Sequence, residues 1–227
     1  MLNGKNILIV VAHSDDETFG MGAVIRRHKL KGDTIRAVSM TDGVGARGKG
    51  NFAEVKARSE NALLASDILG FKWIENYDFK DNCMDNYPLL TITKAIEAVK
   101  ARFEIDIVYT HSSSDLNVDH RIVSHAVLTA FRPQPRETCS EIRQFEVASS
   151  TDFGSGIING KFNPNLFIDI TDTWSSKEKA LNAYSSELRG YPHSRSVEAI
   201  KHLAQHRGNI VGLPMAECFE VVRKIER

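Results

Sequence analysis

The chain has 227 residues, of which 42% are hydrophobic and 6 are proline, and its 29 basic residues balance its 29 acidic residues. A chain of this length can bury a full hydrophobic core. The balanced charge argues against nucleic acid or an anionic membrane as a partner, so we expect a small-molecule partner. The apolar run at residues 7–12 is too short to span a membrane, and Asp15 follows it too soon for a secretory signal. We therefore expect a cytoplasmic protein; the sequence does not specify whether it forms a homo-oligomer.

The three cysteines, Cys83, Cys139 and Cys218, are widely separated and form no CxxC pair. This usage is typical of a reducing compartment. We expect the cysteines to be packing residues.

Strand-like and helix-like segments alternate along the first part of the chain. The residue patterns predict strands at 7–12, 34–41, 72–75 and 106–111, and helices at 17–31, 52–69, 89–103 and 119–131. This order favours parallel strands joined by right-handed helical crossovers. The expected fold is therefore α/β: a Rossmann-like, mostly parallel sheet flanked by helices.

The pattern changes after residues 132–136, where two prolines end the last of these helices. Further strands are predicted at 142–147, 166–170 and 218–224, and further helices at 175–186 and 197–206. No internal repeat or low-complexity tract interrupts the chain. We therefore expect one domain over residues 1–227, with a core at 1–132 and a C-terminal elaboration at 133–227 that completes the substrate pocket.

The first chemical motif lies at the end of the first predicted strand, where an apolar run gives way to His13, Ser14, Asp15, Asp16 and Glu17. Open α/β sheets place ligands and catalytic groups at the carboxyl ends of their strands. Ionisable groups packed against a buried strand are costly to desolvate without a compensating partner. A bound cation would supply that partner.

A second polar motif follows the predicted strand at 106–111, and it contains His111 and His120. Because parallel strands end at the same sheet edge, we expect His13, Asp16 and one histidine of this second loop to converge. Two imidazoles and one carboxylate form the ligand set of hydrolytic zinc sites, which leave a fourth position for water. His120 is the better third ligand because it begins a predicted helix, whereas His111 lies closer to the strand.

Other acidic residues of the two motifs have candidate supporting roles. The side chain of Asp15 diverges from that of Asp16, so Asp15 is free to act as general base on the water. Glu17 either complements the dipole of its helix or hydrogen-bonds a ligand. Asp119 can cap its own helix and also orient a neighbouring ligand. We expect His111 and Asp115 to have structural or supporting roles.

Several segments together carry a family resemblance. Residues 12–17, AHSDDE, resemble the AHPDDE signature of the PIG-L or LmbE-like deacetylase family, and residues 117–120, NVDH, resemble its second metal motif. Three further segments are similar to motifs of that family. Residues 41–43 resemble its SDG-like turn, residues 58–60 with 69–70 resemble its RxE helix and the Leu-Gly that follows, and residues 216–219 resemble its AExF strand.

The resemblance implies a Rossmann-like fold and zinc-dependent hydrolysis of the acetyl group of an N-acetylated amino sugar or sugar conjugate. Carried over position by position, it implies that His13, Asp16 and His120 bind Zn²⁺ and that Asp15 is the base. The same ligands also suit Fe²⁺ or Co²⁺. A small-molecule amino-sugar conjugate is therefore the expected partner.

The chain departs from the family pattern at two positions. Ser14 replaces a proline, which leaves the ligands in place. Asn117 replaces a histidine that many members carry, and an asparagine amide can donate a hydrogen bond to an oxyanion but cannot supply a proton. The proton for the leaving amine then comes either from Asp15, after it has taken one from water, or from His193 in a proline-containing polar loop.

Three arginines are candidates for binding the substrate. Arg58, on a predicted helix, is placed to contact substrate hydroxyls or a phosphate, and a solvent-facing role is equally open. Arg47, in a glycine-rich loop, and Arg195 are candidates for clamping an anionic group, although scattered loop arginines are more often solvated.

Two other functional classes remain open at this stage. Two histidines and a carboxylate also describe the facial triad of non-haem iron enzymes, but those enzymes typically use HxD spacing on an all-β barrel, whereas this chain has HxxD on an α/β pattern. The loss of the usual histidine at Asn117 would also suit a catalytically weak member that binds an acetylated ligand.

Overall fold

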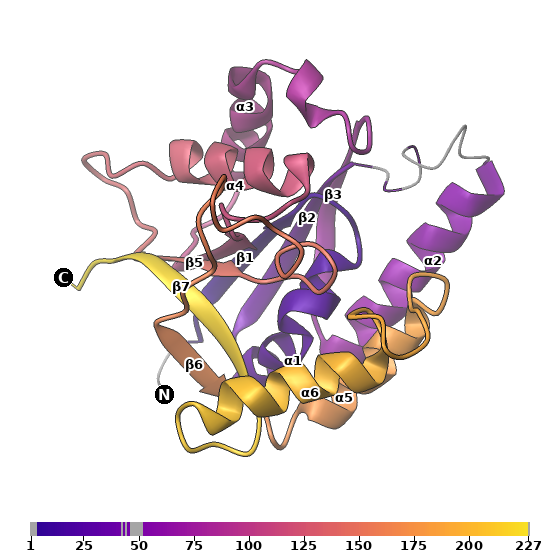
Figure 1. The fold of residues 1–227 in the computed structure, drawn as a ribbon. Helices are drawn as coiled ribbons and strands as arrows, with labels where there is room; N and C mark the ends of the chain where they lie inside the picture. The colour runs from indigo at the N-terminus through magenta and orange to yellow at the C-terminus, as the bar shows by residue number, and fades with distance from the viewer. Residues whose placement is uncertain (1–3, 42, 44, 46–51, 227) are drawn as a thin grey trace.

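A seven-stranded sheet runs through the centre of the molecule (Figure 1). The structure, a computed structural model, describes residues 4–41, 43, 45 and 52–226. The strands are β1 (Asn6–Val11), β2 (Thr34–Thr41), β3 (Lys72–Phe79), β4 (Ile107–His111), β5 (Glu141–Phe145), β6 (Leu166–Asp169) and β7 (Ala216–Lys224). Helices pack against both faces of this sheet, and the predicted α/β class is confirmed.

The sheet is mixed, with the order β3-β2-β1-β4-β5-β7-β6. The first five strands in this order are parallel, and β7 is antiparallel to both of its neighbours. In register, Ile7 of β1 lies opposite Ile35 of β2 on one side and Ile107 of β4 on the other. The chain order reverses between β1 and β4, which is where open α/β sheets bind their ligands.

Two layers of helices cover the sheet (Figure 1). The helices are α1 (Asp16–Leu30), α2 (Phe52–Leu69), α3 (Leu89–Lys100), α4 (Val118–Ala130), α5 (Trp174–Ala183) and α6 (Val197–Asn209), with a short 3₁₀ helix, η2, at Met84–Asn86. Helices α1, α2, α5 and α6 lie on one face, and α3 and α4 lie on the other. No helix in the described part of the chain is both long enough and apolar enough to cross a membrane.

Strand β1 contributes to the hydrophobic cores on both faces. Ile7 and Ile9 point into the core under α1, whereas Leu8 and Val10 point into the core under α4. All four side chains are at most 1% exposed. A central parallel strand must be apolar on both faces, which explains the continuous apolar run in this part of the sequence.

Helix α1 contains a break that the sequence analysis did not anticipate. Met21 has a non-helical backbone, with φ −146° and ψ 23°. The backbone N–H groups of Ala23 and Val24 donate instead to the carboxylate of Glu217 at 3.1 and 2.7 Å. The ammonium of Lys177 on α5 donates to the same carboxylate at 2.7 Å. Glu217, the glutamate of the AExF segment, therefore ties β7 to the interrupted helix.

Several predicted boundaries differ from the observed ones. The third strand was expected to end at residue 75 but continues to Phe79, and the helix expected at 175–186 ends at Ala183. Strand β5 pairs in parallel with β4, so the parallel part of the sheet extends beyond the expected core limit at residue 132. Cys139 and Cys218 are buried, and all three cysteines are free.

Candidate metal centre

The two polar motifs meet at the carboxyl edge of the sheet. His13 and Asp16 lie in the turn from β1 into α1, and His120 lies in the first turn of α4, just beyond β4. Because β1 and β4 are adjacent parallel strands, these two turns leave the sheet side by side. The structure therefore brings together the three residues that the sequence analysis selected as ligands.

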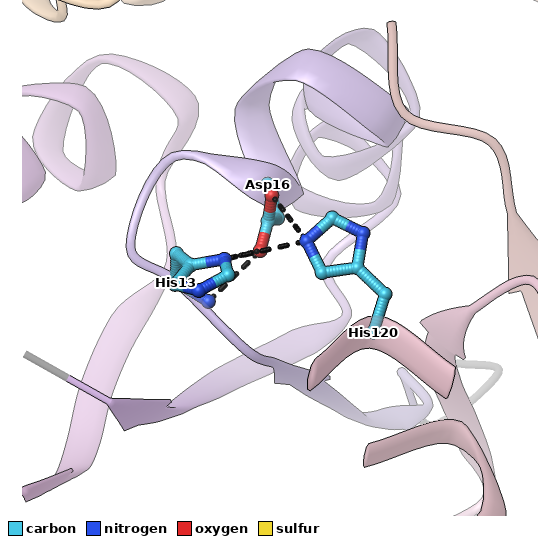
Figure 2. A group of neighbouring side chains, drawn as sticks. All are labelled: His13, Asp16 and His120. Carbon is cyan, nitrogen blue, oxygen red and sulfur yellow. Dashed lines mark hydrogen bonds and ion pairs between the residues drawn. The ribbon is translucent and has the colours of Figure 1, made fainter. Parts of the chain in front are cut away.

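Figure 2 shows how the three side chains face one another. His120 Nε2 lies 3.3 Å from His13 Nδ1 and 3.4 Å from Asp16 Oδ1, and His13 Nδ1 lies 3.3 Å from Asp16 Oδ2. All three residues are buried, and each offers one ligand atom within 4.8 Å of the others. Two imidazole nitrogens and one carboxylate oxygen so arranged fit a three-ligand site for a divalent cation such as zinc.

The second nitrogen of His13 faces two carboxylates. Nε2 lies 3.0 Å from Asp81 Oδ1 and 3.4 Å from Asp119 Oδ2. Burial lowers the pKa of His13, but the carboxylates of Asp119, Asp16 and Asp81 together raise it well above its usual value. Carboxylates behind a metal-binding imidazole fix its orientation and increase its basicity.

Asp119 also holds the segment that follows β3. Its two oxygens accept the backbone N–H groups of Asn82 and Met84, at 2.6 and 3.0 Å. His13, Asp81 and Asp119 form a second group of possible metal ligands. Since the carboxylate of Asp119 is already committed to two backbone donors, we assign the metal to the first group and an orienting role to this one.

His120 is supported in the same way from its other side. Nδ1 of His120 lies 3.1 Å from Asp115 Oδ2, which also accepts the hydroxyl of Thr151 at 2.6 Å. Burial works against ionisation of Asp115, but the neighbouring imidazole and the hydroxyl donors lower its pKa to about 2. Burial likewise lowers the pKa of His120, whereas Asp16 and Asp115 raise it to about 9. Asp115 is therefore placed to orient the ring of His120.

His111 lies beside the three proposed ligands, but its ring nitrogen Nε2 bonds to the backbone. Its ring stacks on that of His120 at a centroid distance of 3.9 Å and an interplanar angle of 14°. Its Nε2 accepts the backbone N–H of Ala12 at 2.8 Å, so that lone pair is not available to a metal. Burial and the neighbouring His120 lower the pKa of His111 to about 3, which keeps the ring neutral.

Asp15 is held by two arginines rather than by the metal group. Its Oδ1 lies 3.0 Å from Arg58 Nη2, and its Oδ2 accepts a hydrogen bond from Arg195 Nη2 at 2.8 Å. Arg58 also donates to Glu187 at 2.8 Å. Both arginines therefore lie at the site, and their guanidinium groups are paired with buried carboxylates.

The remaining candidate residues have varied positions. Asn117 is the N-cap of α4, where its Oδ1 accepts the backbone N–H of Asp119 at 2.8 Å. Glu17 is fully buried; burial raises its pKa to about 8, and it accepts the hydroxyl of Tyr184 at 3.3 Å. His193 is exposed, and its Nδ1 accepts the backbone N–H of Arg195 at 3.0 Å. Arg47 lies outside the described residues.

An open pocket of about 980 Å³ lies above the metal group. The three proposed ligands, Asp15 and Asn117 line it, but His193 and Glu17 are not among its described lining residues. One face of α2 forms part of the wall, with the residues Glu54, Ala57, Arg58 and Asn61. This volume lies at the upper end of the range for small-molecule sites.

Two residues of this site were not predicted from the sequence. Asp81 lies just after β3, which ends at Phe79. The sequence prediction ended this strand at residue 75, so Asp81 was not recognised as a polar residue at a strand end. Glu187 lies in the irregular connection between α5 and α6, where no motif or periodicity marks it.

The fold and the site together define an α/β protein with a candidate metal centre at the carboxyl edge of its sheet. The PIG-L family, described as GlcNAc-PI de-N-acetylase, matches residues 8–131, more than half of the chain. The chain belongs to this family.

The similar proteins include both a hydratase and deacetylases. A 4-oxalmesaconate hydratase of Pseudomonas putida is 27% identical over 210 residues, which cover 81% of this chain and 74% of that protein. An uncharacterized deacetylase, YaiS, of Escherichia coli is 33% identical over 137 residues, which cover 58% of this chain and 71% of that protein. The structure of an N,N'-diacetylchitobiose deacetylase from Pyrococcus horikoshii superposes with a TM-score of 0.78 at 21% identity, over 96% of this chain and 84% of that chain.

Proposed function

We propose that the protein is a metal-dependent hydrolase that removes the acetyl group from an N-acetylated amino sugar or sugar conjugate. The observation that carries the proposal is the convergence of His13, Asp16 and His120 at the base of a pocket that Asp15 also lines. Membership of a de-N-acetylase family and the similarity to a chitobiose deacetylase support an amino-sugar substrate.

Zn²⁺ is the cation that we propose for this group. A cation bound there would polarise the acetyl carbonyl and lower the pKa of water at the open position. The donor set fits this role because Asp119 and Asp115 lie behind the two imidazoles and orient them. Fe²⁺ and Co²⁺ bind the same donor types, so the metal that supports turnover must be measured.

Asp15 is the proposed general base. Its carboxylate accepts guanidinium donors on both oxygens, and a carboxylate offers about four lone-pair sites, so it retains the capacity to accept a proton from water. The two arginines fix the orientation of this carboxylate at the pocket wall. A fixed base within reach of the water contributes about 10²–10⁴-fold to such a reaction.

Asn117 is proposed to donate a hydrogen bond to the oxyanion. Because its Oδ1 is engaged in capping α4, its NH₂ group is the part of the amide that remains available to the pocket. It cannot protonate the leaving amine, so we assign that step to Asp15, which can return the proton it has taken. The alternative acid, His193, would have to move to reach the substrate, because it is exposed and its Nδ1 is engaged with the backbone of Arg195.

A substrate screen tests this proposal. The purified protein, loaded separately with Zn²⁺, Fe²⁺ or Co²⁺, is incubated with a set of N-acetyl amino-sugar conjugates, and products are detected by the mass loss of one acetyl group. We expect deacetylation of at least one conjugate, and no product after treatment with a chelator. Activity that persists after removal of the metal would overturn the proposal.

A hydratase is a second candidate, favoured by one specific observation. The 4-oxalmesaconate hydratase of Pseudomonas putida aligns with 81% of this chain. The same base and cation could activate water for addition to a carbon–carbon double bond. Hydration of 4-oxalmesaconate, followed by its ultraviolet absorbance, distinguishes the two reactions, and we expect no absorbance change with this protein.

A further inference from the structure

We infer that Glu187 determines the charge of the substrates that this pocket accepts. By neutralising Arg58 and Arg195, it makes the pocket select conjugates whose second group is neutral and reject those whose second group is an anion. This inference rests on the proposed deacetylase function and deepens it. It is an alternative to the sequence-based expectations that Arg195 clamps an anionic group and that Arg58 contacts a phosphate.

Two arginines and two carboxylates form a ring of ion pairs in the pocket wall, in which positive and negative side chains alternate. Arg58 bridges two carboxylates, with Nη2 3.0 Å from Asp15 Oδ1 and Nη1 2.8 Å from Glu187 Oε1. Arg195 lies across from it, with Nη2 2.8 Å from Asp15 Oδ2 and Nη1 3.8 Å from Glu187 Oε2. The two cations and the two anions sum to zero charge.

The four side chains are well removed from water. Their exposed fractions are 2% for Asp15, 8% for Glu187, 9% for Arg58 and 17% for Arg195. The guanidinium of Arg195 also lies 4.1 Å from the ring centroid of Phe19, which fixes its plane. Charges that are buried and paired in this way are costly to separate.

An anionic substrate group therefore gains little from these arginines. An arginine can bind the anionic group only if its guanidinium separates from a buried carboxylate, which is costly. Otherwise the substrate becomes a third anion beside two carboxylates that already pair with both arginines. A neutral hydroxyl or amide can accept a remaining N–H without disturbing either pair. The arrangement offers hydrogen bonds to a polar uncharged group but no net positive charge.

The position of Glu187 separates its role from that of Asp15. It lies in the connection between α5 and α6 and lines the pocket, and among its described contacts it pairs with the arginines rather than with the metal ligands. Replacing it with an amide leaves Asp15 with both of its partners. The two guanidinium groups then share a single carboxylate, so this group of four side chains acquires one net positive charge.

A matched pair of substrates tests the inference. The 4-carboxyphenyl and 4-carbamoylphenyl glycosides of N-acetylglucosamine, each as both anomers, have nearly the same shape but differ in charge. We expect the metal-loaded wild-type protein to prefer the carbamoyl compound in kcat/KM. In Glu187→Gln, the ratio of carboxy to carbamoyl kcat/KM should rise by about tenfold, the effect of one charge-assisted hydrogen bond.

Two further variants make the result specific. The double variant Glu187→Gln/Arg195→Gln removes one anion and one cation, so the group is neutral again. Its ratio of carboxy to carbamoyl kcat/KM should therefore return to the wild-type value. If Arg195 instead clamped anions in the wild type, the ratio in the double variant would fall below the wild-type value. This double variant also tests the inference if Glu187→Gln does not fold. Glu198→Gln, an exposed substitution on α6, is the matched control and should not change the ratio.

The outcomes separate this inference from the proposed function. A wild-type preference for the carboxy compound, or an unchanged ratio in Glu187→Gln, overturns the inference while leaving deacetylation intact. If neither glycoside is deacetylated by any variant, the proposed function is decided by the wider substrate screen and not by these two compounds. Calorimetric binding of the same two compounds to the metal-loaded protein then tests the charge selection directly, with the same expected change in ratio.

Discussion

Asp119 Oδ2 lies 3.4 Å from Nε2 of His13, on the side of the imidazole opposite the nitrogen that faces Asp16. The same carboxylate accepts two backbone N–H groups from the segment after β3. The orientation of a proposed metal ligand in the turn after β1 is therefore linked to the segment that follows the edge strand β3. Two substitutions test this link.

Asp119→Asn should weaken metal binding, because an amide is a poorer acceptor for the imidazole N–H and cannot accept from all three donors. We expect the dissociation constant for Zn²⁺ to rise by about 10–100-fold. Titration against a competing chelator measures it. Asp85→Asn, on the exposed surface of the same segment, serves as control and should bind Zn²⁺ like the wild type. Equal affinities in both variants would show that Asp119 does not support the site.

Asn117 caps α4 and is proposed to donate to the oxyanion, and a single substitution can separate the two roles. In Asn117→Asp, the carboxylate can still cap α4, and the helix dipole favours it there, so the melting temperature should stay close to the wild-type value. The amide donor is lost, so kcat should fall by about 10²–10³-fold if it stabilises an oxyanion. Thermal unfolding and steady-state kinetics on the same preparation provide the comparison. An active Asn117→Asp enzyme would remove this residue from the mechanism.

The buried pair of Lys177 and Glu217 should be among the most sensitive positions for stability. Lys177 also donates to the backbone carbonyl of Phe19 at 2.8 Å, so the pair satisfies groups on both sides of the break in α1. Removing one partner of a buried pair costs about 3–5 kcal/mol. We expect Glu217→Ala to lower the free energy of unfolding in urea by this amount. Glu178→Ala on α5 should change it by less than about 0.5 kcal/mol.

His28 should make the stability of the fold depend on pH. Burial lowers its pKa below the usual 6.5, although the nearby Asp33, which accepts from Nδ1 at 2.6 Å, acts in the opposite direction; Arg143 and Lys31 also disfavour the charged form. The unfolded chain therefore binds more protons than the folded one just below pH 6.5, so the contribution of His28 is complete above that pH and is lost as the pH falls.

The corresponding comparison uses His28→Gln. Between pH 7.5 and 5.5, the melting temperature of the wild type should fall more than that of the variant, whose side chain does not titrate. The difference between the two curves isolates His28 from the other groups that titrate in this range. Parallel curves would mean that the environment of His28 does not penalise its charged form.

The parallel part of the sheet could be predicted from the sequence because its central strands are buried on both faces and form continuous apolar runs. Strand β3 was cut short because it lies at the sheet edge, where Glu75 and Asp78 interrupt the apolar pattern. The break at Met21 lies between Gly20 and Gly22, but the groups that stabilise it, Glu217 and Lys177, come from distant segments.

The candidate ligands could be selected in advance because each follows a strand whose end was predicted to within one residue. Asp81 was missed because the end of its strand was misplaced. The pairing of Arg58 with Asp15 and Glu187 depends on the path of an irregular connection, which residue patterns do not predict. Sequence reasoning therefore named Arg58 and Arg195 as candidates, with a solvent-facing role left open for each, but did not predict which charges they meet.

The most direct test of the proposed chemistry combines acetate release with metal content in two variants. With an accepted conjugate from the substrate screen, Asp15→Asn should retain about one Zn²⁺ per chain while losing about 10²–10⁴-fold in kcat. His120→Ala should lose both the metal and the activity. If Asp15→Asn turns over like the wild type, or if His120→Ala keeps its zinc and its activity, the assignment of base and ligands is contradicted.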